Sequence, residues 1–246
     1  MTANGRMGGK ILADGLKAQG VDAIFGVPGE SFLALLDGLY DQRDTIRFIT
    51  CRQEGGAANM AEAYGKLTGR PGVCVVTRGP GATNASVGLH TAFQDSTPMI
   101  LLVGQVGREM LDREAFQEVN HQIFFSEMSK WSAEIKDASR IPEYLSHAFH
   151  VALSGRPGPV VLSLPEDMLR DVAEVEDAPR AIPVQPAPTM EQMSEVREML
   201  KNAERPLMIL GGSGWSPEAC RFIIHFAEQQ DLPVAVTFRC QDRMDN

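Results

Sequence analysis

The runs VCVVT (residues 73–77) and MILLV (residues 99–103) decide the fold class of this 246-residue chain. Both runs would be apolar on both faces of an extended strand. A strand in an antiparallel sheet with one wet face would alternate apolar and polar residues, so these runs are typical of a parallel sheet covered by helices on each side. Outward from them, strand-type and helix-type segments alternate. We therefore predict an α/β fold with a doubly wound parallel sheet and helices on both faces.

This alternation also predicts the individual elements. Apolar runs predict strands at 23–25, 46–50, 73–77, 99–104 and 160–164. Apolar residues that recur with a helical period predict helices at 11–19, 31–40, 55–68 and 83–93.

A proline-rich segment separates this first domain from a second one. Residues 179–188 read PRAIPVQPAP, and four prolines in ten residues exclude a helix or a central strand there. We predict a first domain over 1–172, a linker over 173–189 and a second domain from 190 to 246. Within the second domain the pattern predicts helices at 190–202 and 217–229 and strands at 207–210 and 234–238. These are too few for a self-sufficient parallel sheet, so we expect the chain to end inside that domain.

Composition narrows the function classes. The chain has 23 basic and 32 acidic residues, and its net charge of −9 argues against nucleic acid as a partner. No stretch approaches the roughly 18 apolar residues of a membrane span, and no signal peptide is visible at the N-terminus. The four cysteines show no CxxC spacing, so we expect a reduced, cytoplasmic protein without a zinc site.

Glu54 is the first residue with a candidate chemical role. It follows the predicted strand 46–50, and ligand sites in open α/β sheets gather at the carboxyl ends of the strands. A glutamate in the first turn of a helix also interacts favourably with the helix dipole. Spacing alone therefore favours a simple capping role over a catalytic one.

Two glycine-rich segments invite a nucleotide-binding interpretation. Residues 77–84 read TRGPGATN and predict a tight turn between strand and helix, but the third glycine of the dinucleotide fingerprint is missing and Pro80 removes a donor. Residues 211–214 read GGSG, and Pro217 stands at the third glycine position there. A nucleotide-binding oxidoreductase is therefore a minor alternative. The histidine pair His147 and His150 has no nearby carboxylate cluster, so no metal ligands are predicted.

Several motifs in a fixed order carry a family resemblance. They are FGVPG (25–29), the segment from RQEGG to GPGATN (52–84), PMILLVGQV (98–106), AFQE (115–118) and GRPGPV (155–160). Residues 8–170 resemble the N-terminal, pyrimidine-binding domain of the thiamine diphosphate-dependent enzymes related to acetolactate synthase. Residues 205–238 are similar to the start of that family's central Rossmann-like domain. No GDG motif followed by Asn-Asn is found, so the family's C-terminal diphosphate-binding domain is absent from these residues.

The resemblance implies a set of cofactor-binding residues. Glu54 matches the glutamate that hydrogen-bonds N1′ of the aminopyrimidine, which requires a carboxylic acid in a largely apolar cleft. The other positions that match the cofactor site are Val27, Pro28, Gly29, Thr77, Gly79, Gly81, Ala82 and Asn84. Thiamine diphosphate is the implied cofactor, with Mg²⁺ bound by the absent C-terminal domain, and FAD in the central domain is left open.

Gln105, Glu30, Phe116 and Lys130 match positions near the reacting carbon. The resemblance implies that Gln105 donates to a carbonyl and that Lys130 holds a carboxylate. A core glutamine at a strand end and a solvated lysine are the alternative interpretations of these two residues. Two features depart from the synthases: Glu30 stands where most of them have a small residue, and Trp131-Ser132 follow the lysine in place of a histidine and an asparagine. Both departures place the substrate in question.

The implied activity is that of an acetolactate synthase-like transferase or lyase. Such an enzyme decarboxylates a 2-keto acid, passes the carbanion to a second carbonyl, serves branched-chain amino acid biosynthesis, and works as a homodimer or homotetramer. A simple 2-keto acid decarboxylase or an acyl-CoA lyase on the same scaffold is the alternative that the departures favour. A third hypothesis makes the 246 residues a binding or assembly module that is inactive alone.

Overall fold

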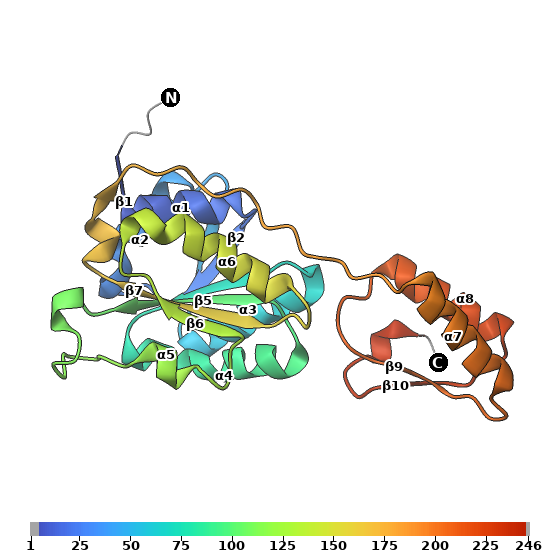
Figure 1. Ribbon diagram of the computed structural model, residues 1–246. Coiled ribbons are helices and arrows are strands. Elements are labelled where there is room, and N and C mark those ends of the chain that lie inside the picture. The colour runs from blue at the N-terminus through green and yellow to red at the C-terminus, as the bar shows by residue number, and fades with distance from the viewer. Residues whose placement is uncertain (1–4, 245–246) are drawn as a thin grey trace. The chain divides into compact units, whose positions relative to one another are not determined.

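A parallel six-stranded sheet lies at the centre of the first part of the chain (Figure 1). The computed structural model describes residues 5–244, and these divide into two compact units, one ending at Pro183 and one beginning at Val184. The sheet order is β3-β2-β4-β5-β7-β6. The strands are β2 (Ala23–Gly26), β3 (Arg47–Thr50), β4 (Gly72–Val76), β5 (Met99–Gln105), β6 (Trp131–Glu134) and β7 (Pro159–Pro165).

Helices cover both faces of this sheet. Helices α1 (Gly8–Ala18), α2 (Leu33–Asp41) and α6 (Ile141–Leu153) pack on one face, and α3 (Glu54–Thr68), α4 (Gly79–Asp95) and the short α5 (His121–Phe124) pack on the other. A short antiparallel pair, β1 (Arg6–Met7) and β8 (Val172–Ala173), joins the two ends of the unit. The predicted α/β fold with a doubly wound parallel sheet is confirmed.

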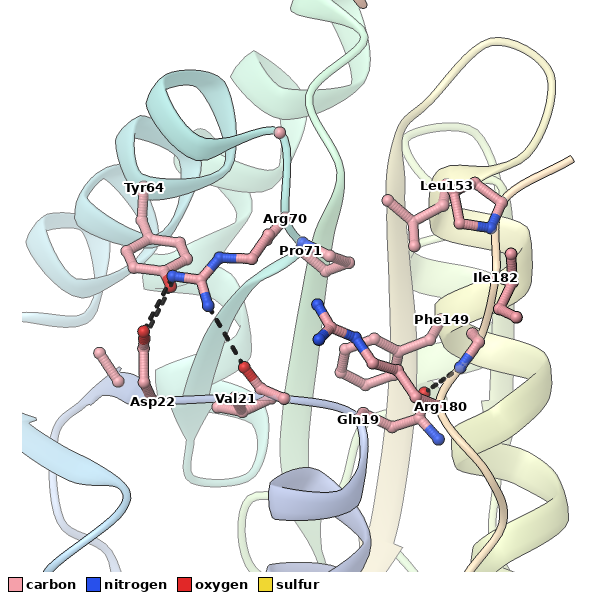
Figure 2. A pocket seen from close by; sticks show the side chains of 15 residues that line it. Gln19, Val21, Asp22, Tyr64, Arg70, Pro71, Phe149, Leu153, Arg180 and Ile182 are labelled. Atoms are coloured by element: carbon pink, nitrogen blue, oxygen red, sulfur yellow. Dashed lines mark hydrogen bonds and ion pairs between the residues drawn. The ribbon is translucent and has the colours of Figure 1, made fainter. Parts of the chain in front are cut away.

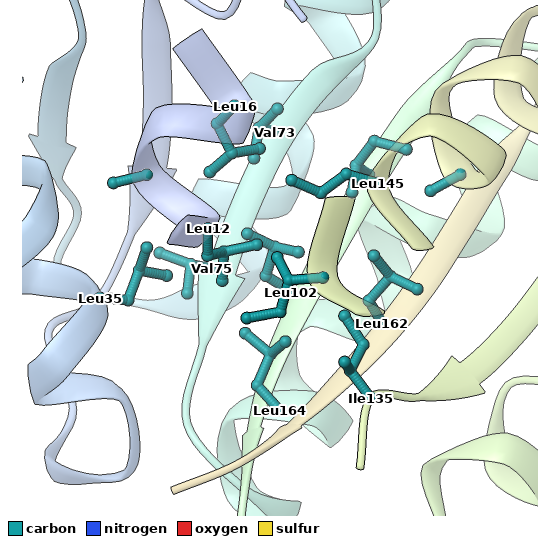
Figure 3. Close-up of a cluster of buried hydrophobic side chains, with 14 of the residues drawn as sticks. Leu12, Leu16, Leu35, Val73, Val75, Leu102, Ile135, Leu145, Leu162 and Leu164 are labelled. Atoms are coloured by element: carbon teal, nitrogen blue, oxygen red, sulfur yellow. The ribbon is translucent and has the colours of Figure 1, made fainter. Parts of the chain in front are cut away.

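The central strands are apolar on both faces because each face has its own core. Val73 and Val75 of β4 belong to the core under α1, α2 and α6, which Figure 3 shows together with Leu102 and Leu162. Cys74, Val76 and the alternate residues of β5 belong to the core under α3 and α4. Successive side chains of a strand point to opposite faces, so a strand buried on both faces must be apolar throughout.

The glycine-rich segment after β4 differs from the prediction. The structure begins α4 at Gly79, whereas the sequence pattern predicted a turn up to Asn84. Pro80 lies in the first turn of the helix, where its missing N–H is not needed and its fixed φ suits the helix. Gly79, Gly81, Ala82 and Asn84 are therefore helical residues near a helix N-terminus.

The second unit contains two helices and a parallel pair of strands. They are α7 (Met190–Asn202), β9 (Met208–Leu210), α8 (Pro217–Gln229) and β10 (Val234–Val236). Thr189 caps α7 in a capping box with Gln192, and Ser216 caps α8. These caps explain why both helices begin where the sequence predicted.

Between the sheet and the second unit, the chain crosses the first unit as an extended strap over residues 179–183. The carboxamide of Gln19 donates to the carbonyl oxygen of Pro179 at 2.9 Å and accepts from the amide of Ala181 at 2.9 Å. Ala181 is buried in the core under α1 and α6. The strap is thus fixed to the first unit on both sides of Arg180.

Candidate active site

The loops at the carboxyl ends of β2, β3 and β4 form the candidate site. From β2 the chain continues to β3 at the sheet edge, and from β4 it continues in the opposite direction to β5, so the sheet has its topological switch point between β2 and β4. Open α/β sheets bind ligands in the crevice at such a point. The predicted residues Val27, Pro28 and Gly29 follow β2, and Thr77 follows β4.

The loops after β2 and β4 are in direct contact. The hydroxyl groups of Ser31 and Thr77 share a hydrogen bond of 2.8 Å. A Cβ atom at Gly29 would lie 2.7 Å from Cβ of Thr77, which is closer than side chains approach. The close contact therefore requires a glycine at position 29.

Glu54 is the first residue of α3 and lies beside the N-terminal part of α4. Gln53 caps α3 by accepting from the amide of Gly56 at 3.1 Å, so the first turn is held without the help of Glu54. The half-buried Glu54 accepts through Oε2 a hydrogen bond of 2.9 Å from Nδ2 of Asn84. The structure thus brings together Glu54 and Asn84, which are 30 positions apart in the sequence.

The close packing of α3 against α4 brings this pair together. Gly88 of α4 touches Ala58 of α3 so closely that a Cβ atom at position 88 would lie 2.6 Å from Cβ of Ala58. Ala57 and Ala61 of α3 and Ala82 and Ala85 of α4 are buried along the same contact. Small residues on both helices allow the first turns to meet at the site.

Gly79 contacts the protein chain itself. Its amide donates to the carbonyl oxygen of Gln117 at 2.9 Å, and a Cβ atom there would lie 2.8 Å from Cγ2 of Val119. The glycine therefore lets the loop over residues 113–119 pack against the N-terminus of α4.

Gln105, at the end of β5, anchors the same loop. Its carboxamide donates to the carbonyl oxygen of Val119 at 2.8 Å and accepts from the amide of Val106 at 3.0 Å, and its side chain is buried. Phe116 lies on the loop that Gln105 holds, with 77% of its surface exposed. In this structure Gln105 holds the loop that carries Phe116.

Lys130 lies apart from the other predicted residues. It precedes β6, at the amino-terminal edge of the sheet, and its amide donates to the carbonyl oxygen of Pro159 at the start of β7. Its ammonium group donates to the carbonyl oxygens of Val151 and Ser154 at the end of α6. In this chain the Lys130 charge caps a helix C-terminus at the other edge of the sheet, and its predicted role in holding a substrate carboxylate stays a prediction.

A buried arginine that the sequence analysis did not single out joins two loops of the site. Arg78, between β4 and α4, donates to Glu30 at 3.0 Å and to Glu166 at 2.7 Å. The Arg78 side chain is 10% exposed, whereas that of Glu30 is 70% exposed. Glu30, a predicted substrate residue, is thus held at the rim of the site by a guanidinium group beneath it.

His121 is a second residue that the sequence analysis missed. It begins α5, is 2% exposed, and its Nδ1 lies 2.9 Å from Oγ of Ser163, which lies 3.5 Å from Oε2 of Glu134. Burial lowers the pKa of His121 to about 4, so the ring is neutral at pH 7. No spacing in the sequence links these three residues, because they lie on separate elements.

Metal-binding clusters and membrane-spanning helices are both absent from the described part of the chain. Residues 5–244 contain no group of three or more His, Cys, Asp or Glu side chains placed to hold a metal ion. Within the same residues no helix is long and apolar enough to cross a membrane.

Comparison with known proteins assigns this arrangement to a family. Residues 6–124 match the family described as "Thiamine pyrophosphate enzyme, N-terminal TPP binding domain". The domain over residues 6–124 belongs to the thiamine pyrophosphate enzymes. The matched residues run from β1 through α5 and include the loops after β2, β3 and β4 that form the candidate site.

Related proteins extend the similarity over both units of the chain. An acetolactate synthase of Arthrospira platensis is 36% identical over 97% of the chain, which spans 42% of that protein. A probable acetolactate synthase large subunit of Methanocaldococcus jannaschii is 35% identical over 94% of the chain and 40% of that protein. The acetolactate synthase isozyme 2 large subunit of Escherichia coli is 33% identical over 94% of the chain and 42% of that protein. The chain therefore spans about two fifths of the length of these relatives.

Proposed function

We propose that these residues form the aminopyrimidine-binding part of a thiamine diphosphate-dependent, acetolactate synthase-like enzyme. The full reaction would decarboxylate a 2-keto acid such as pyruvate and transfer the resulting carbanion to a second carbonyl. The observation that carries the proposal is Glu54 at the switch point of the sheet, oriented by Asn84. The family match and the similarity to acetolactate synthases support the same cofactor and reaction class.

The residues around Glu54 fit the aminopyrimidine half of the cofactor. Oε2 of Glu54 is occupied by Asn84, and no described residue donates a hydrogen bond to Oε1, which is left for a ligand. A carboxylate in this position can accept a hydrogen bond from N1′ of the pyrimidine and hold or return its proton.

The cofactor supplies the electron sink for decarboxylation when it is bound, and the protein supplies orientation and proton control. In our proposal Asn84 sets the orientation of the Glu54 carboxylate, and the Ser31–Thr77 hydrogen bond fixes the loops on either side of the switch point. In the same proposal, Mg²⁺ and the diphosphate are bound by a domain outside these residues. FAD binding by the second unit stays a prediction, which the absorbance of the purified protein between 370 and 450 nm, roughly the range of flavin bands, would test.

The exposed sides of α3 and α4 support assembly into a homodimer or homotetramer. Met60 of α3 and Val87 of α4 are 42% and 56% exposed on the two helices that hold the Glu54–Asn84 pair. These apolar side chains would lose contact with water if a second copy covered the two helices. We propose that a second copy covers this surface and contributes to the site.

The position of Glu30 favours a second candidate function. Its carboxylate lies at the rim of the site, and the Arg78 charge beneath it is shared with Glu166. This arrangement leaves one net negative charge, which disfavours a second keto acid as acceptor. A simple 2-keto acid decarboxylase or an acyl-CoA lyase is therefore the alternative. Product analysis with pyruvate, with and without an acceptor aldehyde or keto acid, separates these reactions.

The test of the main proposal is Glu54→Gln in the natural polypeptide that contains these residues. We expect the rate of decarboxylation with thiamine diphosphate and Mg²⁺ to fall by about 10²–10⁴-fold, because an amide cannot exchange the proton of the pyrimidine. The matched control is Glu143→Gln, which removes an exposed glutamate from the first turn of α6. Both changes remove a favourable helix-dipole interaction, but the control should leave the rate unchanged. Wild-type activity of Glu54→Gln would contradict the proposed role of Glu54 in proton control.

A further inference from the structure

A pocket of about 310 Å³ opens at the amino-terminal edge of the sheet in the first unit (Figure 2). It is lined by the residues that precede β2 and β4, by the end of α6 and by the strap over residues 180–183. Glu54 and the candidate active site lie at the carboxyl edge, so this pocket is a separate feature. Its volume is at the lower end of the range of small-molecule sites.

One wall of the pocket is a charge-neutral network. The hydroxyl of Tyr64 donates to Asp22 at 2.6 Å, and Arg70 donates to the other oxygen of Asp22 at 2.8 Å and to the Tyr64 oxygen. Burial and the bond to Asp22 raise the pKa of Tyr64 to about 12, so the phenol keeps its proton. The charges of Asp22 and Arg70 therefore cancel, and this wall is pre-organised without a net charge.

Arg180 on the opposite side has no such partner. Among residues 5–244, no carboxylate or carbonyl accepts a hydrogen bond from its guanidinium group. Figure 2 shows Arg70 and Arg180 on opposite sides of the pocket. The backbone on both sides of Arg180 is held by Gln19, and a Cβ atom at Gly20 would lie 3.0 Å from Cζ of Arg180. Arg180 is exposed to solvent at the mouth of the pocket, and its guanidinium stands on a fixed segment and packs over Gly20.

Apolar side chains form most of the remaining surface. Phe149 and Leu153 of α6, Pro71 before β4 and Ile182 of the strap line the space next to the guanidinium. One unpaired positive charge with five donors in a planar fork matches a carboxylate, which it can bind through two parallel hydrogen bonds. The apolar walls match an aliphatic or aromatic body attached to that carboxylate.

We propose that this pocket binds a small apolar monocarboxylate, with the carboxylate on Arg180 and the apolar body against Phe149, Leu153 and Ile182. The inference does not depend on the proposed reaction, because no residue of the carboxyl-edge site takes part. A bound carboxylate would tie the strap more firmly to the amino-terminal edge of the sheet.

The test is a titration of the 246-residue chain with 4-methylpentanoate, followed by NMR of the methyl groups of Leu153 and Ile182. We expect saturable shifts of these methyl signals with a Kd below about 1 mM. Arg180→Gln should weaken binding at least about tenfold, because the charge-assisted hydrogen bonds are lost. Arg197→Gln is the matched control, because it removes a positive charge from the exposed helix α7 and should leave binding unchanged. Thermal unfolding of each variant confirms that it is folded.

Three further ligands decide the chemical class. 4-Methylpentanamide has the same shape without the charge, acetate has the charge without the apolar body, and inorganic phosphate has a different anionic group. All three should bind at least about tenfold more weakly than 4-methylpentanoate. Equal binding of the amide, stronger binding of phosphate, or saturable shifts that leave the Leu153 and Ile182 methyl signals unmoved would each overturn the proposal.

Discussion

The ring of His121 is a buried titratable group of the first unit, and it makes stability depend on pH. Nδ1 lies against Ser163, while Nε2 is buried without a partner in the described part of the chain. Burial lowers the pKa of His121 from 6.5 to about 4 in the folded protein. Between these two values the unfolded chain binds more protons than the folded protein, so stability falls as the pH is lowered through this range.

The expected size of this effect can be measured by urea unfolding at pH 7 and pH 5. His121 should contribute a loss of about 2 kcal/mol in the free energy of unfolding between these two pH values. His121→Gln removes the titrating ring, so the difference between pH 7 and pH 5 should shrink by that amount. His90→Gln, a change of an exposed histidine on α4, should keep the wild-type difference. An unchanged pH dependence in His121→Gln would show that the ring is accessible to protons in the folded state.

At the scale of elements, the contact between α3 and α4 positions the candidate site. Gly88→Ala would place Cβ 2.6 Å from Cβ of Ala58, so the two helices must separate. We expect a loss of about 1–3 kcal/mol in the free energy of unfolding, as overpacked cores show. Gly56→Ala is the matched glycine change, because nothing lies within 4 Å of the added Cβ, and it should be neutral or stabilising by up to about 1 kcal/mol. Equal effects of the two changes in urea unfolding would contradict the tight contact.

The elements differ in how far the sequence could predict them. Helices α7 and α8 were predicted with their bounds, because Thr189, Ser216 and Pro217 mark their first turns. Strand β6 was missed, because its four residues WSAE form a half-exposed edge strand without an apolar run. The start of α4 was placed four residues late, because glycine and proline are typical both of turns and of a first helical turn.

The candidate site was predictable where a local motif carries it. Glu54 and Asn84 were singled out through the resemblance of their motifs, and the structure places their side chains in contact. The Arg78–Glu166 and His121–Ser163 pairs join residues 88 and 42 positions apart, and nothing local in the sequence links them. The position of Lys130 at the other edge of the sheet could not be predicted, because a place in a motif does not reveal which edge a residue occupies.

At the scale of the whole molecule, the chain should contact only the aminopyrimidine half of the proposed cofactor and not its diphosphate. We expect the isolated chain to bind thiamine diphosphate weakly, with a Kd above about 100 µM, because the proposed anchor for the diphosphate lies outside these residues. Thiamine, which lacks the diphosphate, should bind about equally well. Isothermal titration with both compounds and Mg²⁺ measures the two affinities. Micromolar binding of thiamine diphosphate with much weaker binding of thiamine would place a diphosphate site within the chain.

The two hydrogen bonds between Gln19 and the strap determine where the chain can be cut if the first unit is to be expressed separately. A stop codon after residue 172 would remove both hydrogen-bond partners of the Gln19 carboxamide. It would also expose to water the apolar surface that Ala181 covers. A product that ends after Pro183 keeps Ala181 buried and both hydrogen bonds of Gln19 intact. The apolar surface beneath Ala181 then stays covered, which should favour a soluble product.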